Sequence, residues 1–176
     1  MISVPQIRTT LVLARVQYLP AVWSNALAGW WLGGGGNHWK LPLLLVGLSL
    51  LASAAMFLND AFDEAPDRHR RADRPIVNGK IPAAIVWRLG FIQLGVGAVM
   101  LAICGKIAAL GALFLVFTIL LYNLIHKFLT AAPWLAGLGR LWIYVIASAT
   151  GAEGLGGPAV FCGVALACFA AGTGFL

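Results

Sequence analysis

The sequence predicts an all-α membrane protein, a bundle of about six transmembrane helices. Hydrophobic residues make up 61% of its 176 residues and charged residues only 10%, and the mean hydropathy is +0.90. The apolar residues occur in long runs, separated by short polar or glycine-rich segments. A soluble globule of this length has too little interior to bury so much apolar surface. Water-soluble, disordered and disulfide-rich secreted proteins are therefore excluded.

Six apolar runs approach the length that a helix needs to cross a bilayer, about 20 residues. Four consecutive glycines follow the first run, and a long polar segment, residues 60–82, follows the second. The expected spans are Leu11–Gly33, Leu41–Asn59, Ala83–Cys104, Ile107–Ile125, Leu135–Gly151 and Ala159–Leu176. We expect them to form a single membrane domain over residues 1–176.

Basic residues are distributed unevenly between the two ends of these spans. With six spans, the N-terminal arm and the segments 60–82 and 126–134 share one side, which carries most of the Lys and Arg. Because positive loops stay inside, these segments are expected in the cytoplasm, in a multi-pass protein of the bacterial inner membrane. The bases are mixed with carboxylates and form no aromatic-lined basic stripe, so nucleic acid is not an expected partner.

Asn59, Asp63 and Asp67 are spaced four residues apart where the second span meets water. On a helix they share one face. Two carboxylates and an amide at a membrane boundary are costly unless they are solvated or bind cations, and Mg²⁺ prefers oxygen ligands together with phosphate oxygens. This face is a candidate magnesium–diphosphate site. A solvated acidic helix end, neutralised by nearby arginines, is the alternative.

Arg15, Lys127 and Arg140 lie at or near the cytoplasmic ends of three other predicted spans. Each can snorkel to the lipid headgroups, but Arg140 is deeper, in an otherwise almost uncharged stretch. Together with the acidic face, the three cations predict one charged pocket inside the bundle. Metal-ligand spacing is absent among the histidines and cysteines, which are His38, His69, His126, Cys104, Cys162 and Cys168.

One stretch resembles the first Asp-rich motif of the UbiA superfamily of intramembrane prenyltransferases, which reads N-D-x-x-D-x-x-x-D and then R-P-[IL]-x-[SN]-G. Here residues 59–68 read NDAFDEAPDR and residues 73–81 read DRPIVNGKI. Residues 122–127 (YNLIHK) and 137–140 (GLGR) are similar to the fourth and fifth helices of that family. The resemblance extends from Arg15 to Arg140.

The resemblance implies a nine-helix bundle, of which this chain corresponds to about six helices, around a cavity open to the cytoplasm and to lipid. It implies Mg²⁺-dependent transfer of a polyprenyl group from its diphosphate to an aromatic acceptor, a quinone precursor or another lipophilic acceptor. By carry-over, Asn59, Asp63 and Asp67 hold the metal and act in catalysis. Arg15, Lys127 and Arg140 would bind the diphosphate.

The chain departs from the family pattern in two ways. Pro66 is expected to end the helix near Glu64 and to displace Asp67. The second Asp-rich motif of the family has no counterpart here, so we expect an N-terminal portion that is inactive by itself. A non-catalytic UbiA-like membrane protein that handles lipids or precursors, or that assists assembly, is the alternative. A CDP-alcohol phosphotransferase would need a D-G-x-x-A-R element, which is absent.

Overall fold

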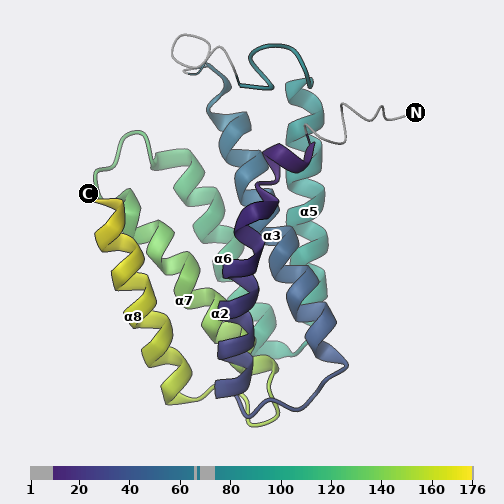
Figure 1. Cartoon of the computed structure of the whole chain (residues 1–176), viewed down its shortest axis with the longest axis vertical. Coiled ribbons are helices and arrows are strands. Elements are labelled where there is room, and N and C mark those ends of the chain that lie inside the picture. The colour runs from purple at the N-terminus through teal and green to yellow at the C-terminus, as the bar shows by residue number, and fades with distance from the viewer. Residues whose placement is uncertain (1–9, 66, 68–73, 176) are drawn as a thin grey trace.

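The computed structural model describes residues 10–65, 67 and 74–175, and every regular element within them is a helix. A short 3₁₀ helix precedes six α-helices, each of which lies where an apolar run predicts it. The elements are η1 (Val16–Tyr18), α2 (Leu19–Leu32), α3 (Lys40–Phe62), α5 (Ala83–Ile103), α6 (Lys106–Ile125), α7 (Ala132–Thr150) and α8 (Gly157–Gly174). The expected all-α bundle is confirmed (Figure 1).

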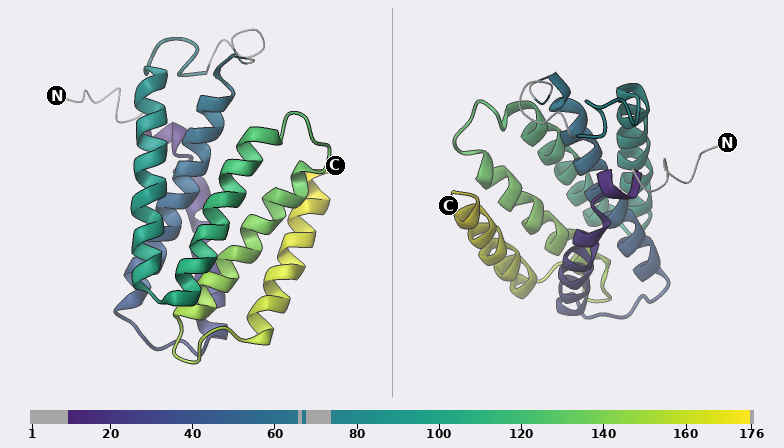
Figure 2. Two further views of the ribbon diagram at one scale, coloured as in Figure 1. Left: turned by 180° about the vertical axis from the view of Figure 1, so that it is seen from behind. Right: turned by 45° about the horizontal axis from the view of Figure 1, so that its top comes forward.

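Helices that follow one another in the chain mostly pack side by side (Figures 1 and 2). α3 packs along α5, α6 along α7, and α7 along α8, while α2 lies against α7 and α3. α8 is at the outer edge and packs mainly on α7. The six helices therefore form one continuous bundle, with α3 and α7 flanking α2.

Large apolar side chains face outward as well as inward. Leu44, Leu48 and Phe57 are at most 1% exposed, whereas Phe117 and Phe161 are 60% and 75% exposed. Lipid tolerates such an exterior and water does not. Four helices (α3, α5, α6 and α8) are long and apolar enough to cross a bilayer. The chain is an integral membrane protein.

The first predicted span, Leu11–Gly33, is not one continuous helix, which corrects the expectation. Residues 10–13 are helical, but Arg15 adopts a left-handed conformation with φ 47° and ψ 47°. The chain then forms η1, and α2 begins only at Leu19, with Pro20 in its first turn. A left-handed non-glycine residue is unfavourable, so surrounding contacts must hold Arg15 in place.

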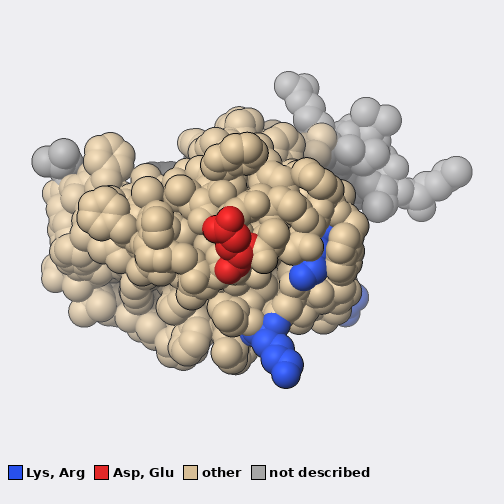
Figure 3. All heavy atoms as spheres, turned by 90° about the horizontal axis from the view of Figure 1, so that it is seen from below, with Lys and Arg blue, Asp and Glu red and all other residues tan. Residues whose placement is uncertain are grey.

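The two ends of the bundle differ in charge. Residues 63–65, 67, 74–82 and 126–131 lie at one end, shown at the top in Figure 1. The loops after α2, α5 and α7 lie at the other end, where few charged side chains reach the surface (Figure 3). The described parts of the segments 60–82 and 126–134, which are expected on the cytoplasmic side, therefore share one end of the molecule, whereas the N-terminal arm before residue 10 lies outside the described residues.

At the charge-poor end the backbones of α2 and α7 meet closely. Gly33, which follows α2, and Gly151, which follows α7, leave no room for a Cβ on either residue. Backbone hydrogen bonds from Glu153 N to Gly33 O (2.9 Å) and from Ala152 N to Gly35 O (2.7 Å) join the two loops. This junction fixes the far ends of α2 and α7 against each other.

We predict that the charged end faces the cytoplasm. Single cysteines at Asn78, at the charged end, and at His38, at the other end, should be labelled by a membrane-impermeant maleimide from opposite sides of oriented vesicles. The background variant lacks Cys104, Cys162 and Cys168. Labelling of both positions from one side would contradict this topology.

Candidate functional site

Three carboxylates gather where α3 ends. Asp60 lies in the last turn of α3 and Asp63 caps the helix. Backbone hydrogen bonds from Asp63 N to Asn59 O (2.9 Å) and from Asp67 N to Asp63 O (3.0 Å) extend the helical path beyond Phe62. Spacings of three and four residues therefore place Asp60, Asp63 and Asp67 on one face.

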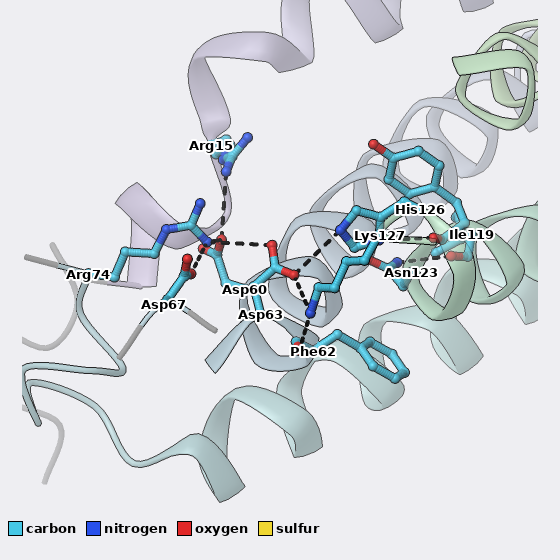
Figure 4. Close-up of polar contacts among 11 residues, drawn as sticks. Arg15, Asp60, Phe62, Asp63, Asp67, Arg74, Ile119, Asn123, His126 and Lys127 are labelled. Carbon is cyan, nitrogen blue, oxygen red and sulfur yellow. Dashed lines mark hydrogen bonds and ion pairs between the residues drawn. The ribbon is translucent and has the colours of Figure 1, made fainter. Parts of the chain in front are cut away.

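Arg74 joins these carboxylates (Figure 4). Its Nη1 lies 2.8 Å from Asp60 Oδ1 and 2.8 Å from Asp67 Oδ2, and 3.9 Å from Asp63 Oδ2. The side chains of Asp60 and Asp67 are only 8% and 12% exposed. Carboxylates with so little water around them need compensating charge. Pro66 itself lies outside the described residues, but the expectation that the helix ends near Glu64 and that Asp67 is displaced is wrong. Asp67 N donates a helical hydrogen bond to Asp63 O, and Asp67 shares Arg74 with Asp60.

Asp63 is also paired from α6. Lys127, just beyond the end of α6, places its Nζ 2.8 Å from Asp63 Oδ1 and donates a hydrogen bond to the Phe62 carbonyl, also at 2.8 Å. The His126 Nε2 lies 3.4 Å from the same Asp63 oxygen, and its ring stacks on Tyr122. The ends of α3 and α6 are thereby connected through one carboxylate (Figure 4).

Arg15 approaches the cluster from the break before α2. Its Nη2 lies 3.6 Å from Asp60 Oδ1. At Arg15 the backbone is left-handed, so the chain changes direction after residues 10–13. The Arg15 guanidinium lies next to α3. Arg15 and Lys127, two of the three predicted cations, therefore contact the acidic face.

A cavity of about 530 Å³ lies between α2, α3, α6 and α7, with α8 contributing at its margin. Its walls are mostly apolar, with side chains such as Leu48, Leu51 and Ile143. The polar or charged groups that line it are Arg15, Tyr18, Asn59, Thr118, Tyr122, Asn123, Arg140 and Thr173. Arg15 belongs both to this wall and to the ion-pair cluster, so the cluster borders the cavity.

Two predicted site residues line the cavity instead of joining the ion pairs. Asn59, on α3, is part of the cavity wall. Arg140, on α7, also lines the cavity, and none of the ion pairs formed by the described residues includes it. Its assignment to the diphosphate stays a prediction.

Four residues of the site were not among the sequence candidates: Asp60, Arg74, Asn123 and His126. The spacing of Asp60 to Asp63 and Asp67 was a usable signal, since residues at i, i+3 and i+7 share a helix face. Arg74 lies in the R-P segment of the motif. Asn123 and His126 belong to the family-like stretch 122–127, but no spacing in the sequence indicates that His126 approaches Asp63 or that Asn123 lines the cavity.

The donor set is consistent with magnesium. Carboxylates and an amide supply oxygen atoms, which are the ligands that Mg²⁺ prefers, and one or two carboxylates suffice when phosphate oxygens and waters complete the shell. Within the described ranges no three His, Cys, Asp or Glu side chains form a ready-made metal group. Arg74 and Lys127 instead supply the positive charge. A Mg²⁺ ion held by Asp63, Asp67 and Asn59 would therefore need oxygen atoms of water or of a ligand to complete its coordination shell.

Comparison with known proteins gives a consistent result. The sequence profile of the UbiA prenyltransferase family matches residues 18–176. The chain is 38% identical over 79 residues to a 4-hydroxybenzoate octaprenyltransferase of Burkholderia ambifaria, covering 41% of this chain and 27% of that protein. It is 32% identical over 95 residues to a digeranylgeranylglyceryl phosphate synthase of Methanoregula boonei, covering 52% and 34%.

A solved structure has the same fold. It comes from a study of the biosynthesis of digeranylgeranylglyceryl phosphate synthase in membranes, and the match has a TM-score of 0.78 at 20% sequence identity. The match covers 94% of this chain and 58% of the solved chain. The present chain thus spans a little over half the length of that protein, and its matches cover about a third or less of the curated relatives.

Because Arg74 pairs with both Asp60 and Asp67, we predict that removing the Arg74 side chain greatly lowers the stability of the protein. Arg74→Ala leaves Asp60 and Asp67 without their nearest cation, and we expect the unfolding free energy to fall by about 2 kcal/mol or more. Thermal unfolding in lipid nanodiscs measures the effect. Lys80→Ala, which removes an exposed cation from the same segment, should change little. Equal melting temperatures for the two variants would contradict a structural role for the Arg74 ion pairs.

Proposed function

The chain belongs to the UbiA prenyltransferase family, and from this we propose that it takes part in transferring a prenyl group from its diphosphate to an acceptor within the membrane. One observation supports this most directly. A cluster that brings carboxylates and cations together borders a largely apolar cavity, and Arg15 belongs to both. A prenyl diphosphate has the same two parts, a charged head and an apolar chain.

In this proposal the diphosphate binds at the end of α3. Asp63 and Asp67, with Asn59 beside them, would hold Mg²⁺, which when bound offsets the charge of the leaving diphosphate. Arg15 and Lys127 bind diphosphate oxygens, and Arg74 adds a third cation next to them. These three side chains already lie around the carboxylates.

The proposed transfer exchanges one bond for another. The C–O bond between the allylic carbon and the diphosphate breaks, and the bonding electron pair leaves with the diphosphate. A nucleophilic atom of the acceptor forms the new bond to that carbon and then loses its proton to the released diphosphate or to water. The apolar walls of the cavity keep water from the reactive carbon. The cations around the site stabilise the negative charge that develops on the leaving group.

We expect Asp63→Asn to lower magnesium-dependent binding of inorganic diphosphate and of geranylgeranyl diphosphate by about tenfold to a hundredfold, because a charge-assisted contact is lost. Titration calorimetry with and without Mg²⁺ measures the effect. Glu64→Gln removes a neighbouring charge and is the matched control. Unchanged metal dependence in Asp63→Asn would favour the solvated acidic helix end.

A second assay distinguishes an enzyme from a non-catalytic relative. The protein is incubated with radiolabelled prenyl diphosphate, Mg²⁺ and a panel of acceptors. Prenylated acceptor that disappears in Asp63→Asn supports transfer. Diphosphate binding with no product at any acceptor favours the alternative, a membrane protein that handles lipids or precursors.

A further inference from the structure

We propose that Asp60 is a positioning residue, which binds no metal itself but holds the guanidinium groups of Arg15 and Arg74 beside the bound diphosphate. This inference rests on the proposed function, which assigns Mg²⁺ to Asp63 and Asp67 and the diphosphate to the surrounding cations. It gives the remaining carboxylate of the cluster a role of its own.

Asp60 pairs with two arginines from distant parts of the chain (Figure 4). Its Oδ1 accepts a hydrogen bond from Arg74 Nη1 at 2.8 Å and lies 3.6 Å from Arg15 Nη2. Arg15 is at the break before α2, whereas Arg74 belongs to the segment between α3 and α5. One carboxylate oxygen therefore fixes where two guanidinium groups lie relative to each other.

The surroundings of Asp60 differ from those of Asp63. Asp63 Oδ1 lies 2.8 Å from Lys127 Nζ, and the Asp63 side chain is 15% exposed, against 8% for that of Asp60. Mg²⁺ keeps several waters and is bound through one or two carboxylates. A hydrated ion reaches the more exposed carboxylates more easily, and it does not need a third. Asp60 is therefore free to serve the arginines.

Arg74 is shared between two carboxylates, so the role of Asp60 becomes larger when the metal is present. Arg74 Nη1 lies 2.8 Å from Asp67 Oδ2 as well as from Asp60 Oδ1. If Mg²⁺ compensates Asp67, that carboxylate no longer needs Arg74, and the pair with Asp60 still holds the guanidinium in place. A guanidinium has five donors in a planar fork, so those that Asp60 does not use can reach phosphate oxygens.

Arg15 depends on Asp60 in the same way. Among the described residues Asp60 is the only carboxylate paired with Arg15, whose side chain is 36% exposed. Arg15 also lines the cavity, so Asp60 holds a cation where the charged cluster borders the apolar walls. A long side chain fixed before the ligand arrives loses less conformational entropy on binding.

Two effects of Asp60 on a bound anion have opposite signs. As a negative charge it repels a diphosphate, whereas as a partner of Arg15 and Arg74 it keeps both cations at the site. Charge alone predicts that removing the carboxylate strengthens anion binding. Positioning predicts that it weakens anion binding, and this difference in sign makes the role measurable.

The test compares Asp60→Asn, Asp60→Glu and Asp63→Asn in nanodiscs by calorimetry, with two probes: Mn²⁺ alone, and inorganic diphosphate in excess Mg²⁺. We expect Asp60→Asn to weaken diphosphate binding about tenfold, because charge-assisted contacts are lost, and to leave Mn²⁺ binding unchanged. Asp63→Asn should weaken both. Asp60→Glu keeps the charge and should lose less than Asp60→Asn. Glu153→Gln, which removes an exposed charge at the other end of the bundle, is the control and should change neither.

A double-mutant cycle shows whether Asp60 acts through the arginines. Arg15→Gln is the partner variant, because Arg74 also stabilises the fold. The loss of diphosphate affinity in the double variant should be smaller than the sum of the two single losses, as expected for residues that act as a unit.

Three results would overturn the inference. Weaker Mn²⁺ binding in Asp60→Asn would make Asp60 a metal ligand, unchanged or tighter diphosphate binding would leave it a buried counter-charge, and full additivity with Arg15→Gln would separate it from Arg15. If Asp60→Asn does not fold, the same two affinities of Asp60→Glu decide: weaker diphosphate binding with unchanged Mn²⁺ binding supports positioning, and any other result contradicts it. A wild-type protein that binds no diphosphate would reject the proposed function, and this inference with it.

Discussion

The shared guanidinium of Arg74 is the interaction on which the charged end of the molecule depends. Asp60, Asp63 and Asp67 carry like charges on one helix face, and burying them there is costly without a compensating cation. Arg74 supplies this cation, and its ion pairs connect its own segment of the chain to α3. Lys127 pairs with Asp63 at the end of α6, and Arg15, at the break before α2, lies 3.6 Å from Asp60. Three distant parts of the chain thus meet at the end of one helix.

Backbone contact plays the corresponding role at the opposite end. There the glycines that follow α2 and α7 touch, and two hydrogen bonds join the loops. Nearer the charged end, residues of both helices face the cavity, among them Val22 of α2 and Ala136 and Gly139 of α7. The two helices therefore converge where backbone meets backbone and diverge where ion pairs hold the other elements. The cavity lies in the space that this divergence leaves open.

The sequence predicts the helices well and the site only in part. Apolar runs mark all six helices because lipid requires an apolar exterior on each. They do not reveal the break at Arg15, whose left-handed backbone has no glycine to mark it and whose ion-pair partner, Asp60, lies 45 positions later. Asn59, Asp63 and Asp67 are visible as a helix face. Arg74 lies in the R-P segment of the motif, but its pairing with Asp60 and Asp67 cannot be read from local spacing. His126 and Asn123 join the site through the packing of α6, which local spacing does not indicate.

The break at Arg15 also affects how the protein meets the bilayer. The 14 residues of α2 extend about 21 Å at 1.5 Å per residue, well short of a hydrocarbon core of about 30 Å. The mismatch can be met by local thinning of the bilayer around α2 or by water that penetrates to the level of η1. Either response places lipid headgroups or water next to Arg15 and Asp60. A charged head could then remain hydrated while its hydrocarbon chain stays among lipid tails.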